Sequence, residues 1–231
     1  MSRLSIIVPT LNEEAGIGAT LDALQPLRLR KVEIIVVDGG STDRTRAIAA
    51  PLSDAVIDGP RGRASQMNAG ASQACGAVLL FLHADTRLPP NGDDLILNGL
   101  ARSGCRWGRF DVTLAGHHPL LGAVAWLMNQ RSRLTGIATG DQAIFVDRQI
   151  FQSCGGFPDI ALMEDIALSS TLKPLSPPLC LSECVVTSAR RWEQRGVIRT
   201  IFLMWKLRLA YFFGADPARL ARSYGYIAKK R

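Results

Sequence analysis

Short apolar runs that alternate with helical patterns are the feature that most limits how this chain can fold. Four such runs lie at residues 4–8, 32–37, 55–57 and 77–82. Their apolar residues follow one another without alternation, which is typical of strands buried on both faces of a parallel sheet. The intervening segments read as helices at residues 13–27, 41–50 and 63–74. The repeated unit of strand, turn and helix predicts a parallel sheet with right-handed crossovers.

The second half of the chain departs from this pattern after Pro89 and Pro90. We expect strands at residues 106–114 and 143–146, helices at residues 93–103, 120–133, 169–172 and 195–213, and a Pro-rich loop at residues 174–178. No stretch rich in Gly, Ser or Pro is long enough to separate two domains. The sequence therefore predicts a single α/β domain over residues 1–231. Its central sheet is mostly parallel and flanked by helices, with an apolar helix near the C-terminus.

The charge of the chain favours anionic partners. Lys and Arg number 27 against 20 Asp and Glu, a net charge of +7, which suits nucleotide phosphates or an acidic membrane surface. Nucleic acid is disfavoured because no zinc-finger, RNA-recognition or basic-zipper pattern is present. The five scattered cysteines favour reduced thiols in a cytosolic compartment. We see neither a signal peptide nor a run of the ~20 apolar residues that a spanning helix needs, so we expect a cytoplasmic protein.

Polar residues gather where three of the predicted strands end. The segments that carry them contain Pro9, Thr10, Asn12 and Glu13 after the first strand, Asp38, Gly39, Ser41 and Asp43 after the second, and His83, Ala84 and Asp85 after the fourth. The carboxyl ends of parallel strands share one edge, where open α/β sheets bind ligands. Asp43 is expected to cap a helix. For Asp38 we favour a ligand contact over a turn role, because Ser41 and Asp43 supply the local turn chemistry.

His83 and Asp85 leave two interpretations open. Side chains two apart on an extended end point to the same side, so both could converge on one metal-bound phosphate. In the other interpretation Asp85 caps the following turn and His83 is incidental. The loops lack the Gly-x-Gly-x-x-Gly fingerprint and the Gly-Lys-Ser/Thr phosphate loop, which disfavours a dehydrogenase and a P-loop ATPase.

An ordered set of motifs resembles the family 2 glycosyltransferases. Similar to the nucleotide-sugar half of that family are IIVPTLNE at residues 6–13, VDGGSTD at 37–43, GRASQMNAG at 62–70 and the strand ending in HAD at 83–85. Similar to its acceptor half are GDQAIF at residues 140–145, GGFPDIALMED at 155–165 and SARRW at 188–192. The HAD and RRW variants resemble a bacterial subgroup labelled arsenosugar-biosynthesis-type glycosyltransferases. On this resemblance, residues 1–90 bind the nucleotide sugar, residues 91–195 bind the acceptor, and residues 196–231 form an apolar and basic helical segment.

The resemblance implies a GT-A-type fold and an inverting transfer from a UDP- or GDP-linked sugar, assisted by Mg²⁺ or Mn²⁺. Asp85 would bind the cation. His83 would be a second ligand or would only contact a phosphate or fix its loop, and we favour the latter. The nucleotide-sugar site implied in this way comprises Pro9, Thr10, Asn12, Glu13, Asp38, Gly39, Ser41, Arg63, Asn68, Ala84, Asp85, Arg191 and Trp192.

The Glu-Asp pair of the same resemblance supplies the catalytic candidates. Asp165 is the expected general base, since inversion by direct displacement needs a carboxylate near the acceptor hydroxyl. Its charge would also complement the dipole of a helix starting near residue 166. Glu164 is expected to orient the acceptor or a neighbouring Arg. Ser188 stands where processive relatives carry Gln, which favours a single transfer.

The C-terminal segment leaves its surroundings open. Residues 200–213 are apolar nearly all round, broken by Lys206 and Arg208. The segment could lie at the inner face of the plasma membrane, followed by the basic residues Arg219, Arg222, Lys229, Lys230 and Arg231. It could instead cover the sheet or pair with a second copy of the chain. The acceptor is a small molecule or a lipid. A nucleotidyltransferase and a catalytically idle sugar-nucleotide- or lipid-binding module are the rival functions.

Overall fold

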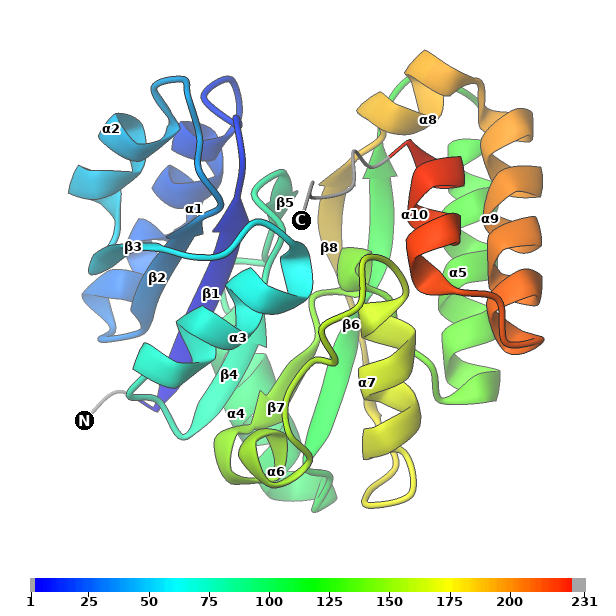
Figure 1. Ribbon diagram of the computed structural model, residues 1–231. Coiled ribbons are helices and arrows are strands. Elements are labelled where there is room, and N and C mark those ends of the chain that lie inside the picture. Colours follow the sequence, from blue (N-terminus) through cyan, green and yellow to red (C-terminus); the bar gives the residue numbers. More distant parts are fainter. Residues whose placement is uncertain (1–2, 226–231) are drawn as a thin grey trace.

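The computed structural model describes residues 3–225 and contains one eight-stranded mixed sheet flanked by helices (Figure 1). The strand order is β3-β2-β1-β4-β7-β6-β8-β5. The strands are β1 (Leu4–Thr10), β2 (Glu33–Asp38), β3 (Ala55–Asp58), β4 (Val78–Phe81), β5 (Thr86–Arg87), β6 (Trp107–Ala115), β7 (Phe145–Asp147) and β8 (Leu179–Ser188). The helices are α1 (Ile17–Leu29), α2 (Thr45–Ala49), α3 (Arg63–Gln73), α4 (Gly92–Ser103), α5 (Leu121–Thr135), α6 (Arg148–Ser153), α7 (Glu164–Leu172), α8 (Arg190–Arg195), α9 (Val197–Phe212) and α10 (Pro217–Tyr224), with 3-10 turns η1 (Ala50–Leu52) and η2 (Gly140–Gln142).

The first half of the sheet is the expected parallel one. β1 pairs in parallel with β2 and β4, and β2 with β3. All seven residues of β1 are buried, because apolar clusters cover both faces of the sheet: one contains side chains of α1, the other side chains of α3 and α7. The α/β class is thereby confirmed. The sheet as a whole is mixed, since β7 runs antiparallel to β4 and β6, and β5 antiparallel to β8.

The ten-residue strand β8 is absent from the sequence-based expectation. Its middle, Ser182 to Cys184, is exposed and polar enough to resemble a loop. β8 nevertheless pairs in parallel with β6 along its whole length, with a register shift between Phe110 and Asp111. The strand matters for the site because its end lies beside the loop after β4: the Ser188 amide donates to the Asp85 carbonyl oxygen at 3.2 Å.

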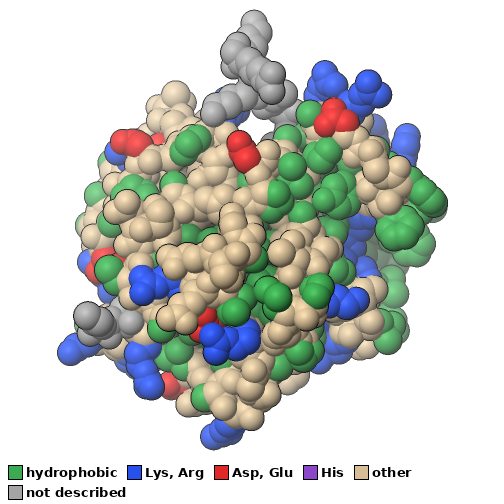
Figure 2. Space-filling view, turned by 60° about the horizontal axis from the view of Figure 1, so that its bottom comes forward, with side chains coloured by type: hydrophobic (Ala, Val, Ile, Leu, Met, Phe, Trp, Pro, Cys, Tyr) green, Lys and Arg blue, Asp and Glu red, His purple; other side chains and the backbone are tan. Residues whose placement is uncertain are grey.

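The helix expected at residues 195–213 is two helices. Gly196, with φ of +84°, separates α8 from α9. Together with α10, α9 lies beside α5 at one end of the molecule (Figure 1). Several large apolar side chains of α9 remain exposed: Ile198, Phe202, Trp205, Leu209 and Phe212. Figure 2 shows apolar side chains gathered along the right-hand edge, the side on which α9 lies in Figure 1. Lys229, Lys230 and Arg231 lie outside the described residues.

No helix within residues 3–225 is both long and apolar enough to cross a membrane. All five cysteines carry free thiols.

The contact of α3 with the sheet predicts opposite effects for two glycine substitutions. A Cβ at Gly70 would lie 2.5 Å from Ile7 Cγ2 and 2.9 Å from Val37 Cγ2, whereas one at Gly122 in α5 meets nothing within 4 Å. Overpacking should make Gly70→Ala lower the free energy of unfolding by about 1–3 kcal/mol. Gly122→Ala should raise it by up to about 1 kcal/mol, because alanine favours a helix. Urea denaturation measures both. Equal effects would show that helix propensity outweighs the contact.

Candidate active site

Hydrogen bonds lock together the loops at the carboxyl edge of the parallel strands. Gln66 of α3 donates from Nε2 to the carbonyl oxygens of Thr10 and Val37, 2.8 Å each. Asn12 has φ of +53°; its amide donates to Ser41 Oγ at 2.9 Å, and its Oδ1 accepts from the Thr42 amide at 2.9 Å. The structure thus gives Asn12 and Ser41 a structural role at the edge where we expected them to bind the nucleotide.

Asp38 itself makes the turn after β2. Its side chain is buried, and Oδ2 accepts from the Gly40 amide at 3.1 Å and from the Ser41 amide at 2.9 Å. Burial alone would raise the pKa of Asp38, but the hydrogen bonds from Ser41 and Gly40 and the charge of Arg46 hold the pKa below its usual value. The expectation that Ser41 and Asp43 supply this turn without Asp38 is therefore wrong. The contact of Asp38 with the base stays a prediction.

Asp43 lies one residue before the N-cap position of α2, which is Arg44 and has no side-chain capping hydrogen bond, so the expected cap is wrong; the carboxylate still contacts the start of the helix. Its Oδ1 accepts from the Thr45 amide at 3.0 Å, and its Oδ2 accepts from the Glu14 amide at 3.2 Å. The carboxylate therefore also ties α2 to the loop after β1.

Asp141 is a candidate site residue that sequence reasoning did not single out. His83 Nδ1 lies 3.4 Å from Asp141 Oδ1. The Asp141 side chain keeps 42% exposure. Burial would raise the pKa of Asp141, but the hydrogen bond with His83 and the charges of His83, Arg63 and Arg191 lower it to about 2. The sequence feature that could have indicated Asp141 is its place in GDQ, residues 140–142, within the GDQAIF motif already noted.

Gly140 lets the turn that carries Asp141 lie close to His83, since a Cβ at Gly140 would lie 2.5 Å from His83 Nε2. The antiparallel strand β7, which follows Gly140 after a short gap, pairs with β4. It thereby brings the GDQ turn back to the edge where β4 ends.

Glu164 and Asp165 begin α7 beside the same turn. Asp165 Oδ2 accepts from the Gly140 amide at 2.8 Å. Glu164 is buried; burial first and then the charge of Asp165 raise its pKa. Both acids share a small cavity whose lining also includes Met67, Phe81, His83, Gly140, Ile144 and Phe157. The structure therefore assembles His83, Asp141, Glu164 and Asp165 from three separate segments of the chain.

Asn68 of α3 fixes the loop that leads to this pair. Its Nδ2 donates to the Phe157 carbonyl oxygen at 2.8 Å, and its Oδ1 accepts from the Phe157 amide at 3.0 Å. Ser65 Oγ also donates to Asp159 at 2.9 Å. Asn68 thus has a role that the sequence did not predict, and its contact with a nucleotide stays a prediction.

Asp85 is half-buried, and its carboxylate makes no hydrogen bond or ion pair with other residues in the range 3–225. Its loop is held by its backbone, with Thr20 Oγ1 donating to the Ala84 carbonyl oxygen at 2.6 Å. Nowhere in the described part of the chain do three or more His, Cys, Asp or Glu side chains cluster as a metal site. The residues still fit Mg²⁺ or Mn²⁺ on a diphosphate, because Mg²⁺ needs only one or two protein carboxylates beside phosphate oxygens and water.

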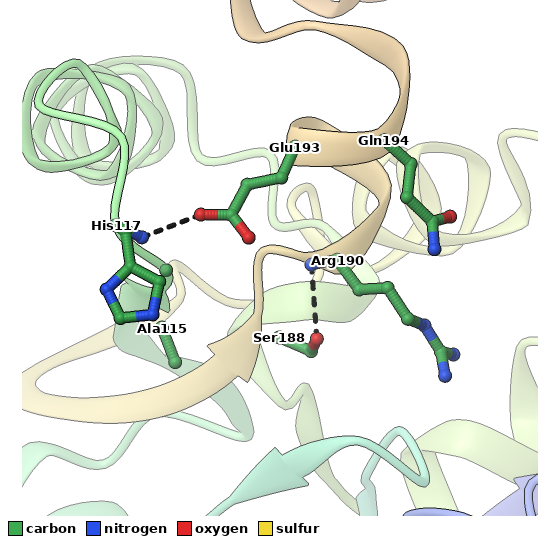
Figure 3. Close-up of a pocket in the computed structure, with 7 residues that line it drawn as sticks. Ala115, His117, Ser188, Arg190, Glu193 and Gln194 are labelled. Atoms are coloured by element: carbon green, nitrogen blue, oxygen red, sulfur yellow. Dashed lines mark hydrogen bonds between the residues drawn. The ribbon is translucent and has the colours of Figure 1, made fainter.

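A pocket of about 480 Å³ opens where β6 and β8 end. Its lining is Ala115, Gly116, His117, Ser188, Arg190, Glu193 and Gln194 (Figure 3). Glu193 Oε1 accepts from the His117 amide at 2.6 Å on one side, and Arg190 extends on the other. Arg190 Nη2 lies 3.4 Å from Glu13 Oε2. This ion pair joins the late Arg motif to the loop after β1, 177 residues away in the sequence.

Arg191 and Trp192 differ in their surroundings. The Arg191 guanidinium lies over the Tyr224 ring, 4.7 Å from its centroid, and its charge acts on Asp141. Trp192 packs against the cluster that contains Leu114 and Leu121. Arg191 therefore belongs to the charged surroundings of the site, while stacking of Trp192 on a nucleotide stays a prediction.

Comparison with known sequences agrees with the motifs. The model of the Glycosyl transferase family 2 matches residues 5–112, just under half of the chain. A PGL/p-HBAD biosynthesis glycosyltransferase of Mycobacterium bovis is 44% identical over 91 residues, which cover 36% of each chain. The probable glycosyltransferase YdaM of Bacillus subtilis is 28% identical over 238 residues, covering 93% of this chain and 55% of that protein. The chain thus spans about a third to just over half of the length of these relatives.

Solved structures share the fold at low sequence identity. Staphylococcus aureus TarS 1–349 superposes with a TM-score of 0.67 at 18% identity, covering 82% of this chain and 61% of that one; TarS has also been solved with UDP-GlcNAc. The mannosyltransferase PcManGT of Pyrobaculum calidifontis, in complex with GDP-Man and Mn²⁺, has a TM-score of 0.64 at 21% identity, covering 97% and 69%. At these identities the likeness establishes the fold alone.

The molecule is a GT-A-type α/β protein. Its residues 5–112 match the model of the Glycosyl transferase family 2, and its sequence relatives are glycosyltransferases. The predicted fold is confirmed, and so is the resemblance of the motifs to family 2 glycosyltransferases. The narrower resemblance to the arsenosugar-biosynthesis-type subgroup stays a prediction.

The depressed pKa of Asp38 predicts a pH-dependent loss in Asp38→Asn. A carboxyl group whose native pKa lies below its unfolded value stabilises the fold above that unfolded value, about 3.9 for Asp. This contribution is lost as the pH falls through the native pKa. Asp38→Asn should therefore lower the free energy of unfolding by about 1–3 kcal/mol near neutral pH. The difference from the unsubstituted protein should narrow below about pH 4.

Urea denaturation across that pH range measures this difference, with the exposed Asp22→Asn in α1 as the matched control. A difference that stayed constant down to about pH 3 would contradict the assignment.

Proposed function

We propose that this protein transfers a single sugar from a UDP- or GDP-linked donor to an acceptor hydroxyl with inversion at the anomeric carbon. The observation that supports this most is the meeting of Asp165, Glu164, His83 and Asp141 at the carboxyl edge of the parallel strands. The match of residues 5–112 to the Glycosyl transferase family 2 model supports the reaction class. TarS with UDP-GlcNAc and PcManGT with GDP-Man offer both nucleotide types as precedents.

The donor lies across the ends of β1, β2 and β4 in this proposal. Glu13 and Asp38 face the ribose and base, and Pro9, Thr10, Gly39 and Ser41 form the floor. Arg63 and Arg191 add positive charge toward the diphosphate, as their effect on Asp141 suggests. Asp85, with its unengaged carboxylate, holds Mg²⁺ or Mn²⁺. When bound, the cation offsets the charge that builds up on the departing nucleoside diphosphate. His83, directed at Asp141, positions that loop.

Asp165 acts as the general base. It takes the proton of the acceptor hydroxyl while the acceptor oxygen bonds to the anomeric carbon and the bond from that carbon to the diphosphate oxygen breaks. The nucleoside diphosphate leaves on the opposite face, so the configuration inverts. The hydrogen bond from the Gly140 amide fixes Asp165. Burial and the charge of Asp165 raise the pKa of the neighbouring Glu164. Glu164 orients the acceptor.

Two rival functions make different predictions. A nucleotidyltransferase of similar fold would carry a Gly-rich, Lys-containing loop after its first strand, and this chain has PTLNEE there. A catalytically idle binding module would bind sugar nucleotides without consuming them. Ser188 at the end of β8 favours single transfer over polymer synthesis.

Donor hydrolysis and transfer test the proposal directly. We expect the protein to release nucleoside diphosphate from at least one member of a panel of UDP- and GDP-sugars, and to need Mg²⁺ or Mn²⁺ for it. Asp165→Asn should reduce turnover by at least about 100-fold, within the range that general-base catalysis contributes, while donor affinity measured by calorimetry stays near normal. Asp85→Ala should weaken metal-dependent donor binding. Binding without any turnover would favour the idle module, and retained turnover in Asp165→Asn would remove Asp165 as the base.

We further propose that α9 holds the protein against an anionic membrane surface in the cytoplasm. Phe202 and Trp205 are 71% and 70% exposed, and Lys206 lies beside them. Apolar side chains flanked by cations bind the interface of bilayers that contain acidic lipids. Such contact would bring a lipid acceptor to the site. A homodimer that buries the same helix is the competing arrangement.

Vesicle sedimentation tests this contact. The protein should pellet with vesicles of phosphatidylcholine and phosphatidylglycerol, and less with phosphatidylcholine alone. The double variant Phe202→Ser/Trp205→Ser should bind several-fold less, whereas Leu29→Ser, which removes an 87%-exposed leucine at the end of α1, should bind as before. Equal binding by both variants, or a dimer in solution that only the double variant dissolves, would contradict membrane contact.

A further inference from the structure

Two arginines near the candidate base have buried nitrogen atoms without hydrogen-bond partners. Within residues 3–225, the buried side-chain polar atoms that lack a partner are Nε and Nη2 of Arg131, in α5, and Nε of Arg208, in α9. Buried polar groups are nearly always hydrogen-bonded, and a buried charge without a partner is strongly unfavourable. These atoms therefore point to a ligand that supplies acceptor oxygens.

The neighbouring arginines, Arg109 and Arg133, have acidic partners. Arg109 is fully buried but forms an ion pair with Asp111. Arg133, one half-turn along α5 from Arg131, lies 2.6 Å from the same carboxylate. The local acid is thus already engaged by two other guanidinium groups, which leaves Arg131 without one.

Electrostatic effects place the two guanidinium groups near Asp165. Burial first, and then the positive charge of Arg208, lower the pKa of Arg131 to about 9, while Asp165 acts in the opposite direction. Burial also lowers the pKa of Arg208, again against the charges of Asp165 and Asp141. The same helix brings Tyr211 close enough that burial and then Asp165 raise its pKa. The arginine pair therefore lies close enough to the candidate base for their charges to act on one another.

The acids of this region are engaged elsewhere. Asp165 accepts from the Gly140 and Ile166 amides, and Asp141 faces His83. The two positive charges also repel each other. An anion bound between them would attract both and offset this repulsion. Guanidinium groups bind phosphate and carboxylate oxygens in planar, paired hydrogen bonds. A phosphate group offers enough acceptor oxygens for both arginines at once.

We propose that Arg131 and Arg208 form a phosphate subsite for the acceptor, which holds a phosphorylated acceptor with its hydroxyl toward Asp165. The identification of the bound molecule as the acceptor rests on the proposed function; the binding of a phosphate group does not. In the proposed function the donor diphosphate lies at the ends of β1, β2 and β4, whereas Arg131 and Arg208 come from α5 and α9. The phosphate belongs to a soluble monoester or to a lipid phosphate, and the apolar face of α9 is compatible with the second source.

Direct binding tests the subsite without any need for turnover. The probes are glycerol 3-phosphate and dodecyl phosphate below its micelle concentration, with glycerol and a neutral dodecyl glycoside as uncharged matches. UDP and Mn²⁺ are present in excess to occupy the donor region. We expect both phosphate probes, but neither neutral match, to raise the melting temperature and to titrate to saturation. Tighter binding of dodecyl phosphate by about tenfold or more would identify a lipid source, because buried methylene groups add affinity; equal affinities would identify a soluble one.

Matched variants locate the response. Arg131→Gln and Arg208→Gln should each lower the affinity for both phosphate probes at least about tenfold, as expected when one charge-assisted hydrogen bond is lost. Their melting temperatures without probe should not fall, because each removes a buried charge that lacks a partner. The control variants are Arg133→Gln in α5 and Arg199→Gln, an exposed residue in α9. Each removes one positive charge outside the subsite, so each should bind the probes as the unsubstituted protein does.

The results separate this inference from the proposed function. If no phosphate probe binds, or if Arg131→Gln and Arg208→Gln bind as well as their controls, the subsite is wrong even for an active transferase. If phosphate binds with the expected variant pattern while no sugar nucleotide is turned over, the subsite stands and the transferase activity does not. In an active enzyme, Arg131→Gln should raise the KM of a phosphorylated acceptor, whereas Arg133→Gln should not.

Discussion

Burial of the parallel strands on both faces is the constraint on which the rest of the structure depends. Every residue of β1 and nearly every residue of β2 is shielded by helices, so their backbone groups pair within the sheet and most of their side chains are apolar. Charged groups can appear only where the strands end. The polar residues at these ends therefore share one edge, and Gln66 from α3 ties the ends of β1 and β2 into a single rigid rim.

A second constraint comes from the reversal of direction in the middle of the sheet. Because β7 runs antiparallel to β4, the GDQ turn shortly before it returns to the edge where β4 ends, and Gly140 packs directly on His83. The Gly140 amide then fixes Asp165, while Asn68 holds the preceding loop. The loop that leads to Asp165 is thus held by a hydrogen bond to Asn68 of α3, and Asp165 itself by the Gly140 amide.

The sequence predicted the parallel half well because its signals are local. Apolar runs bounded by Pro9, Gly39 or His83 give both the strands and the residues at their ends. It failed at β8, where the exposed middle of a strand resembles a loop, and at Gly196, which divides the expected terminal helix. It also assigned the turn after β2 to Ser41 and Asp43, although the deciding hydrogen bonds go to Asp38.

The sequence alone determined the fold class, the edge on which polar residues gather, and the resemblance to family 2 glycosyltransferases, since each follows from the order and spacing of residues along the chain. Only the tertiary structure decided which charges meet. Arg109 and Arg131 both stand in ordinary local patterns, yet Arg109 pairs with Asp111, whereas two nitrogens of Arg131 find no hydrogen-bond partner among residues 3–225. Whether a buried charge finds a partner depends on how helices pack across the sheet, which no local pattern of residues encodes.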